Sequence, residues 1–164
     1  MSTDLSISLA ELLAWNDEAA HHWNNHLAAN PALLEVACDI GNTGNVQGFV
    51  RHIWGAELRW ANRLAGLENK EPATGPLETL FETHVEARDV FRGLIDGPET
   101  AWAEAYVLNF DWVPEDQRRV SRRKVAAHAL FHSHRHYAQL ATLARTAGFP
   151  ARFRGDVLFS SALG

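Results

Sequence analysis

Hydrophobic side chains recur at the helical spacing of about 100° per residue in four long segments of the chain. These segments cover residues 6–29, 45–67, 77–95 and 122–147. Each has apolar residues on one side and polar residues on the other, so the pattern predicts four amphipathic helices. In the first segment the apolar stripe consists of Leu9, Leu12, Leu13, Asn16, Ala20, Trp23 and Leu27.

Residues that disfavour helical backbone separate the four segments. A residue before proline is pushed out of the helical region, and glycine supplies turns between elements. Ser121 is a suitable N-cap for the last helix, because its hydroxyl can accept a hydrogen bond from a backbone N–H of the first turn. The breaking sequences are Asn30-Pro31, Gly41-Asn42-Thr43-Gly44, the linker 71–76, Asp96-Gly97-Pro98 and Gly148 with Pro150.

Four amphipathic helices with no convincing strand pattern between them predict an all-α protein, and specifically a four-helix bundle. The length of 164 residues fits one domain, which we expect to cover residues 1–164. The linker between the second and third helices is long enough to cross the bundle. We therefore expect a crossover connection there, and a plain up-down-up-down order is not required.

Two stretches lie outside the four helices. Residues 99–120 are rich in aromatic side chains, and we expect a short helix followed by an extended arm. A loop of this length in a compact domain is often functional, so it either covers a site as a lid or caps the core. Residues 151–164 include the apolar residues Phe153, Val157, Leu158 and Phe159, and we expect this tail to dock on the bundle or on a partner subunit.

Composition and charge exclude several classes of partner. The net charge is -5 and the pI is about 6.0, whereas nonspecific nucleic-acid binding usually needs a basic face. The one dense basic run, within residues 118–124, is interpreted as a solvated loop. No stretch approaches the roughly 20 apolar residues of a membrane span. We expect neither nucleic acid nor membrane as a partner.

Cysteine usage and the first residues of the chain bear on location. Cys38 is the single cysteine, so no intrachain disulfide can form. This suits a reducing compartment. The first residues lack the basic and apolar pattern of a signal peptide. We therefore expect a cytoplasmic protein.

Histidine spacing on the last predicted helix is the most informative chemical feature. His128, His132 and His136 are four residues apart and form successive rungs on one face. By angle, His132 and His136 point toward the core. An uncompensated buried polar group costs about 1–3 kcal/mol. A shared metal ion would satisfy both rings. Alternatively, both rings hydrogen-bond to buried polar groups or line a water-filled cleft.

The pair has the spacing of the HExxH zinc motif, but Ser133 stands where the catalytic glutamate of that motif would be. We therefore do not expect a protease of that class.

A third ligand must come from another helix. His52 lies about 120° from the centre of the apolar stripe of its own helix, which counts against it. However, Gly48, Gly55 and Ala56 leave room for a close helix approach, and a bundle helix can bury two flanks. His84 lies on the apolar stripe of the third helix and is interpreted as a core histidine or one that supports a ligand. The other histidines are interpreted as partly exposed, for His22 and His26, or as surface residues, for His21 and His134.

These residues together resemble the DinB-like family. The resemblance rests on His52-Ile53, Glu57 and Trp60 in the second helix, and on His132-x3-His136 followed by Gln139-Leu140, Leu143 and Gly148 in the last. It extends over nearly the whole chain in helix order and linker placement. It implies a bundle with a three-histidine metal site, in which the ligands are His52, His132 and His136. One departure is Tyr137, which stands where the family often has a basic residue.

A metal held by three imidazoles with an open position matches catalytic rather than structural sites. The open position would take water, giving a hydroxide nucleophile, or a thiol, which loses its proton on coordination. Imidazole ligands suit several divalent ions, of which we expect zinc or nickel, with iron and copper as alternatives. Glu57, on the buried stripe, is the candidate catalytic residue, orienting a ligand histidine or accepting a proton. A buried ion pair with Arg63 or Arg88 is an equal alternative.

Two classes of function follow. The first is a metal-dependent enzyme of transferase, isomerase or hydrolase type, and the resemblance implies a small-molecule substrate with a low-molecular-weight thiol. The second is a non-catalytic, stress-associated metal-binding bundle that acts as a dimer. A bundle without metal, whose histidines serve a hydrogen-bond network, is a third. A homodimer is expected from family habit and from six tryptophans that the chain does not bury all at once.

Overall fold

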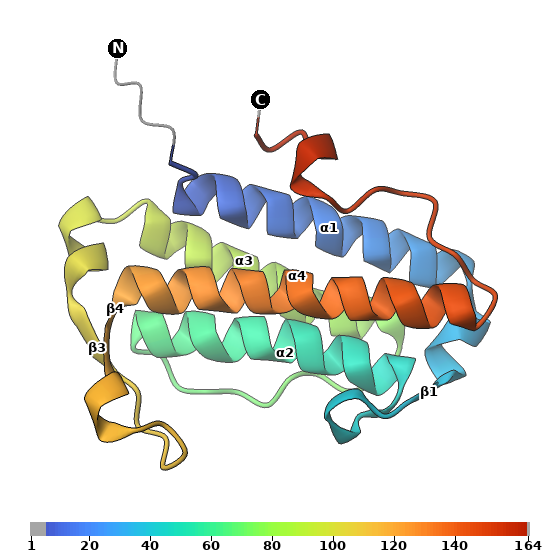
Figure 1. Ribbon diagram of the computed structural model, residues 1–164, viewed down its shortest axis with the longest axis horizontal. Helices are drawn as coiled ribbons and strands as arrows, with labels where there is room; N and C mark the ends of the chain where they lie inside the picture. Colours follow the sequence, from blue (N-terminus) through green and yellow to red (C-terminus); the bar gives the residue numbers. More distant parts are fainter. Residues whose placement is uncertain (1–5, 164) are drawn as a thin grey trace.

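Four long α-helices form the fold in the computed structural model, which describes residues 6–163 (Figure 1). The helices are α1 (Leu9–Ala29), α2 (Val46–Ala65), α3 (Leu77–Ile95) and α4 (Arg122–Thr146). The predicted all-α four-helix bundle is confirmed, and each helix begins and ends within one turn of its predicted bounds.

Side-chain caps determine where the helices begin. Ser8 and Glu11 form a capping box at α1, in which the backbone N–H of Glu11 donates to Ser8 Oγ and the backbone N–H of Ser8 donates to the Glu11 carboxylate. This box places the start at Leu9 rather than at Ser6. The Ser121 side chain caps α4 by accepting from the N–H of Lys124 at 3.1 Å, as predicted. The caps thereby fix where α1 and α4 begin.

The connection between α2 and α3 crosses the bundle. The chain returns along α2 after its end, so that α2 and α3 run in the same direction while α1 and α4 run in the other (Figure 1). Gln47 near the start of α2 donates to the carbonyl of Gly75 at 2.7 Å, and Arg51 donates to the carbonyl of Ala73 at 3.0 Å. The predicted crossover linker is therefore confirmed.

Gly55 of α2 contacts the crossover linker rather than a neighbouring helix. A Cβ atom at Gly55 would collide with the ring of Pro72 in the returning linker, so glycine is required by that close approach. At Gly48 a Cβ would collide with the carbonyl of Thr43 in the preceding turn. The prediction that these two glycines admit a neighbouring helix was wrong, because the ring of Pro72 occupies the space above Gly55 and the backbone of Thr43 occupies that above Gly48.

The core has two apolar clusters with polar side chains between them. Helix α2 packs against α3 and α4, and α1 packs against the same two helices, so α1 and α2 lie diagonally across the bundle. One apolar cluster is centred on Trp23, Phe49 and Trp54, and the other on Leu64, Phe91 and Leu130. Fully or almost fully buried polar side chains also occur in the interior: Asn16, Glu57, Asn62, Thr83, His84, Ser133 and His136.

Two small antiparallel hairpins lie outside the helices. Strand β1 (Ala37–Cys38) pairs with β2 (Gly44–Asn45), and β3 (Ala105–Val107) pairs with β4 (Arg119–Ser121). The sequence did not predict them, since two or three residues are too few to display an alternating pattern. The remaining elements are the 3-10 helices η1 (Pro31–Glu35), η2 (Ile40–Asn42), η3 (Glu99–Ala103), η4 (Glu115–Gln117) and η5 (Val157–Phe159).

The segment 99–120 and the tail are both anchored to the bundle. The short helix predicted at the start of this segment is η3, but the expected extended arm is instead one side of the β3–β4 hairpin. In the tail, Phe153 packs on the apolar cluster around Trp23, and the indole N–H of Trp15 donates to the carbonyl of Gly155 at 3.3 Å. Within residues 6–163, none of the helices has the length and apolar character needed to cross a membrane.

Candidate metal centre

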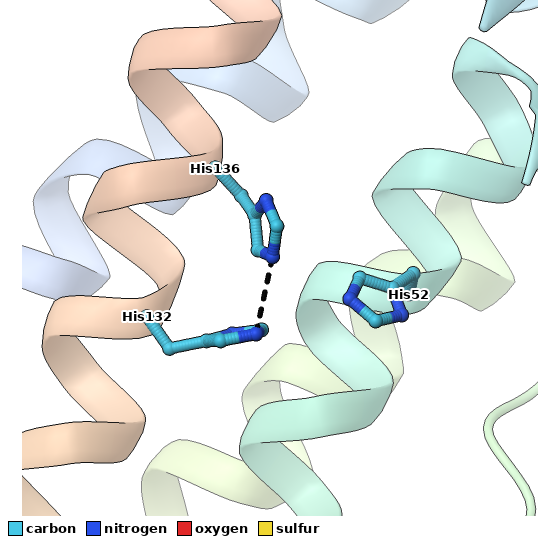
Figure 2. A group of neighbouring side chains, drawn as sticks. All are labelled: His52, His132 and His136. Carbon is cyan, nitrogen blue, oxygen red and sulfur yellow. Dashed lines mark hydrogen bonds between the residues drawn. The ribbon is translucent and has the colours of Figure 1, made fainter. Parts of the chain in front are cut away.

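His52, His132 and His136 face one another across the contact between α2 and α4 (Figure 2). Each offers one ring nitrogen, and these atoms all lie within 4.8 Å of one another. The ring centroids of His52 lie 5.6 Å from His132 and 5.1 Å from His136. The structure thus brings together the three side chains that the sequence predicted as metal ligands.

The two histidines of α4 form the tightest part of the group. The Nε2 atoms of His132 and His136 lie 3.1 Å apart, as the dashed line in Figure 2 shows. The Nδ1–H of His136 donates to Oε1 of Gln139 at 2.6 Å, so the Nε2 atom of His136 carries a lone pair. Because Nε2 of His132 lies 3.1 Å away, this lone pair is placed to accept an Nε2–H from the neutral ring of His132.

His52 reaches the group because α2 has two buried flanks. Its position is about 140° around the helix from Glu57, which faces α1 and α3. The ring of Phe49 lies over this part of the site, 6.5 Å from the ring of His52 and 5.2 Å from that of His136. The unfavourable angle of His52 relative to the main apolar stripe therefore marks the second flank of α2, which packs on α4.

All three imidazoles are held in the neutral form. Burial lowers the pKa of His132 to about 3, with further repulsion from His136 and Arg135. Burial also lowers the pKa of His52, with further repulsion from His136 and Arg59, and it lowers the pKa of His136 despite the hydrogen bond that His136 donates to Gln139. A metal ion is bound by the lone pair of neutral imidazole, so these rings are in the ligand-competent state at neutral pH.

The donor set fits a late first-row divalent ion. In the part of the chain that the structure describes, the group consists of three imidazoles with no carboxylate or thiol. Such a set suits zinc, nickel, copper or iron rather than magnesium or calcium. The Nδ1 atom of His132 is buried and has no hydrogen-bond partner among residues 6–163. An unsatisfied buried nitrogen is unusual in a core that serves packing alone.

Positive charge surrounds the centre, although the whole chain is acidic. The guanidinium of Arg135 lies 3.5 Å from Nε2 of His136, and Arg59 is close enough to lower the pKa of His52. Arg59 itself has a lowered pKa through burial and through its neighbours Arg63 and Arg51. This field favours anions over cations near the exposed edge of the site.

A second group of titratable side chains lies in the interior, among α1, α2 and α3. Both ring nitrogens of His84 donate to carboxylates, Nδ1–H to Oε2 of Glu57 at 2.6 Å and Nε2–H to Oδ1 of Asp17 at 3.0 Å. Asn16 donates to the other oxygen of Glu57 at 2.9 Å, and Arg88 lies 3.4 Å from Asp17. The two cations balance the two carboxylates in this buried network.

His84 is consequently a cation. Its burial alone would lower the pKa, but Glu57 and Asp17 outweigh that effect and raise the pKa to about 9. The charge of His84, with those of His21 and Arg88, in turn lowers the pKa of Asp17 against the opposing effect of burial. Asp17, His21 and His84 are also close enough to hold an ion. However, an imidazolium that donates from both nitrogens has no free lone pair for one.

Glu57 lies in this network and not at the three-histidine centre. Its hydrogen-bond partners are His84 and Asn16, so orienting a ligand histidine and pairing with Arg63 or Arg88 both disagree with its position. The physical reason is that α2 turns Glu57 toward α1 and α3, whereas His52 faces α4. Sequence reasoning missed Asp17 altogether. Asn16, a polar residue inside an apolar stripe, was the available signal for a buried polar network.

The remaining histidines are distributed as follows. His22 and His26 are half-buried and His21 is exposed, in agreement with the predictions. His134 was predicted to lie at the surface, and this was wrong. Its ring stacks on Trp15 with 3.5 Å between centroids, and burial lowers its pKa to about 4. The tail and α1 cover the side of α4 that a single amphipathic helix would leave to solvent.

Comparison with known proteins gives one match. A family model described as DinB family matches residues 1–153 of the chain. No curated protein and no solved structure matches it.

Proposed function

The chain belongs to the DinB family, and from that premise we propose that His52, His132 and His136 hold a divalent metal ion, zinc or nickel, in an enzyme that transfers a thiol to an electrophilic substrate. The observation that carries this proposal is the convergence of three neutral imidazoles from two helices, with no fourth ligand in the group among residues 6–163. Three protein ligands with an open position are typical of catalytic rather than structural sites.

The residues around the ligands prepare the site for this role. Gln139 fixes the tautomer and the ring orientation of His136 through the 2.6 Å hydrogen bond to Nδ1. Burial keeps His52 and His132 unprotonated, so no proton has to leave before an ion binds. Arg135 and Arg59 raise the local concentration of anions, which suits a thiolate or an acidic substrate.

A bound divalent ion would act as a Lewis acid and lower the pKa of a coordinated thiol or water. In the proposed reaction the thiol sulfur forms a bond to the electrophilic carbon, the leaving group departs with the bonding electron pair, and the thiol proton passes to solvent. With water in place of the thiol, the same arrangement would support hydrolysis.

The first test is elemental analysis of the purified protein before and after treatment with a chelator. We expect about one metal ion per chain in the wild type and its loss in His136→Ala. A matched control is His22→Ala, which removes a half-buried histidine of α1 that lies outside the group. Absence of metal from the wild type, even after reconstitution with zinc or nickel, would refute the proposed function.

A metal-loaded protein would then be screened with low-molecular-weight thiols and electrophilic acceptors. We expect turnover that disappears in His136→Ala and after chelation, while the control variant retains it. Full metal content without turnover in any combination would leave the protein as a metal-binding bundle and contradict the transferase proposal.

A non-catalytic role for the same centre has support of its own. The three histidines belong to α2 and α4, so a bound ion would tie together two helices that are far apart in the sequence. A stress-associated metal-binding bundle that acts as a homodimer would then show a large drop in melting temperature in His132→Ala and no thiol-transfer activity. Sedimentation giving a mass near 18.3 kDa would remove the dimer from this alternative.

A further inference from the structure

A pocket of about 520 Å³ lies between the second half of α2, the first turns of α4 and residues 108–120. Its walls are mainly aromatic and aliphatic, with a few charged side chains at the margin. Pockets of 300–1,000 Å³ with this mixture are typical of sites for small organic molecules. The pocket is covered by part of the aromatic segment 99–120, for which the sequence predicted either a lid over a site or a cap on the core.

Three aromatic rings form one side of the pocket. Phe110 and Trp112 stack with 5.3 Å between centroids, and Trp60 meets Phe110 edge-on at 5.9 Å. Trp112 is 79 % exposed, which leaves a large flat indole face in water. The arrangement is held in place by Arg63, whose guanidinium lies 5.1 Å from the ring of Trp60 and 5.2 Å from that of Phe110. A flat, exposed and stacked surface of this kind favours a planar ligand.

The charges at the margin favour an acidic ligand. Arg119, Lys124 and Asp116 line the pocket, and among residues 6–163 none of them forms an ion pair within 4.0 Å. The two cations therefore exceed the single carboxylate and are free of competing partners. An unpaired lysine or arginine beside an apolar wall is suited to binding a carboxylate while the ring of the same ligand packs on the wall.

The pocket adjoins the three-histidine centre. His128 is part of its lining, and the ring of His128 lies 6.0 Å from that of His132 and 5.7 Å from that of Trp60. Because His128 and His132 are one helical turn apart on the same face of α4, a ligand in the pocket lies about one turn of helix from the centre. A bound molecule can therefore extend from the aromatic wall toward the centre.

We propose that this pocket binds the electrophilic substrate of the reaction proposed above, and that this substrate is an aromatic carboxylate. The ring stacks on Trp112 and Phe110, the carboxylate pairs with Arg119 or Lys124, and the reactive group extends past His128 toward the centre. That the ligand is a substrate rests on the proposed function, but its binding depends only on the pocket.

The test uses 2-naphthoate as the probe, with binding followed by isothermal titration calorimetry on the full chain. We expect the wild type to bind 2-naphthoate at least fivefold more tightly than its neutral counterpart 2-naphthalenemethanol. Trp112→Ala should weaken binding of 2-naphthoate at least fivefold, and it should not disturb folding because the indole is exposed. The matched control is Phe131→Ala, which removes another exposed aromatic side chain from α4 outside the pocket.

A second variant tests the charge. Lys124→Gln combined with Arg119→Gln should remove the preference for the carboxylate over the alcohol, while binding of the alcohol stays unchanged. Equal binding of both probes by the wild type would overturn the carboxylate assignment. Unchanged binding of 2-naphthoate in Trp112→Ala would overturn the pocket assignment.

The two proposals can fail separately. Chelator-treated protein should still bind 2-naphthoate, because the pocket contains none of the three proposed ligands. Retained binding in a protein that never takes up metal would support the pocket and refute the proposed function. Full metal content with no binding of 2-naphthoate would refute the pocket alone. A dimer in sedimentation that dissociates in Trp112→Ala would assign this surface to a second copy of the chain and overturn the inference.

Discussion

His84 and the three histidines of the centre lie in the same bundle, but their surroundings are opposite in charge. His84 is fully buried between the carboxylates of Glu57 and Asp17, which raise its pKa to about 9. Burial lowers the pKa of the half-buried His132 to about 3, and the neighbouring imidazoles and Arg135 add to this effect. The same side chain is therefore a fixed cation in one place and a neutral lone-pair donor in the other.

The comparison teaches that burial does not by itself decide the state of a histidine. Desolvation disfavours the charged form in both places, and the sign of the nearby charges determines the outcome. In the interior the charge holds α1, α2 and α3 together through hydrogen bonds. Between α2 and α4 no carboxylate among residues 6–163 stabilises the protonated form of the imidazoles, so their lone pairs remain available. We therefore assign metal binding to this group.

The largest expected effect is a loss of stability when a substitution breaks the interior network. His84→Ala should lower the free energy of unfolding by about 3–5 kcal/mol, since it leaves Glu57 as an unpaired charge in the core. Urea unfolding at pH 7 measures this change. His22→Ala, which removes a half-buried histidine of α1 outside this network, is the control and should change stability by less than about 1 kcal/mol. A loss below 1 kcal/mol in His84→Ala would contradict the charged network.

The next largest effect concerns the stability that zinc adds at the three-histidine centre. Removing a ligand histidine should cost little in the metal-free protein, because these imidazoles have no carboxylate partners to leave unpaired. Zinc at about one hundred times its dissociation constant should raise the free energy of unfolding by about 2.7 kcal/mol in the wild type. In His132→Ala this increment should vanish. Urea unfolding with and without zinc gives both numbers, and an equal zinc effect in the variant would exclude His132 as a ligand.

The pH dependence of stability should follow His84. Its folded pKa of about 9 lies above the value of about 6.5 for an unfolded chain, so its contribution is complete below pH 6.5 and is lost as the pH rises through about 9. Between pH 7 and pH 9 we expect a loss on the order of 2 kcal/mol in the metal-free protein. Urea midpoints across this range test the prediction. The His84→Ala variant should lack this dependence, and a wild type whose stability is flat to pH 9 would refute it.

The smallest effect concerns the support of one ligand. Gln139→Leu removes the acceptor for Nδ1–H of His136 and frees its tautomer, so zinc affinity should fall about tenfold, or about 1.4 kcal/mol. Competition with a chromophoric chelator measures the affinity. Stability without metal should stay close to that of the wild type because Gln139 is exposed. A wild-type affinity would show that the hydrogen bond does not orient the ligand.

The sequence by itself determined the local features of this protein. The 3.6-residue periodicity defined four helices, their caps and breakers placed the ends, and the spacing of His132 and His136 put two rings on one face of α4. These features depend on residues within a few positions of one another, where backbone geometry leaves little choice. The crossover was foreseen from linker length, since a short loop cannot connect parallel helices.

Only the tertiary structure decided which side chains from different helices meet. Resemblance, and not angle, selected His52, because the sequence pattern does not reveal that α2 buries a second flank against α4. The pairing of Glu57 with His84 and Asp17 joins three helices, and the β3–β4 hairpin joins segments too short to carry a pattern. Such contacts depend on the rotation and register of packed helices, which arise from the sum of many weak packing interactions rather than from any local motif.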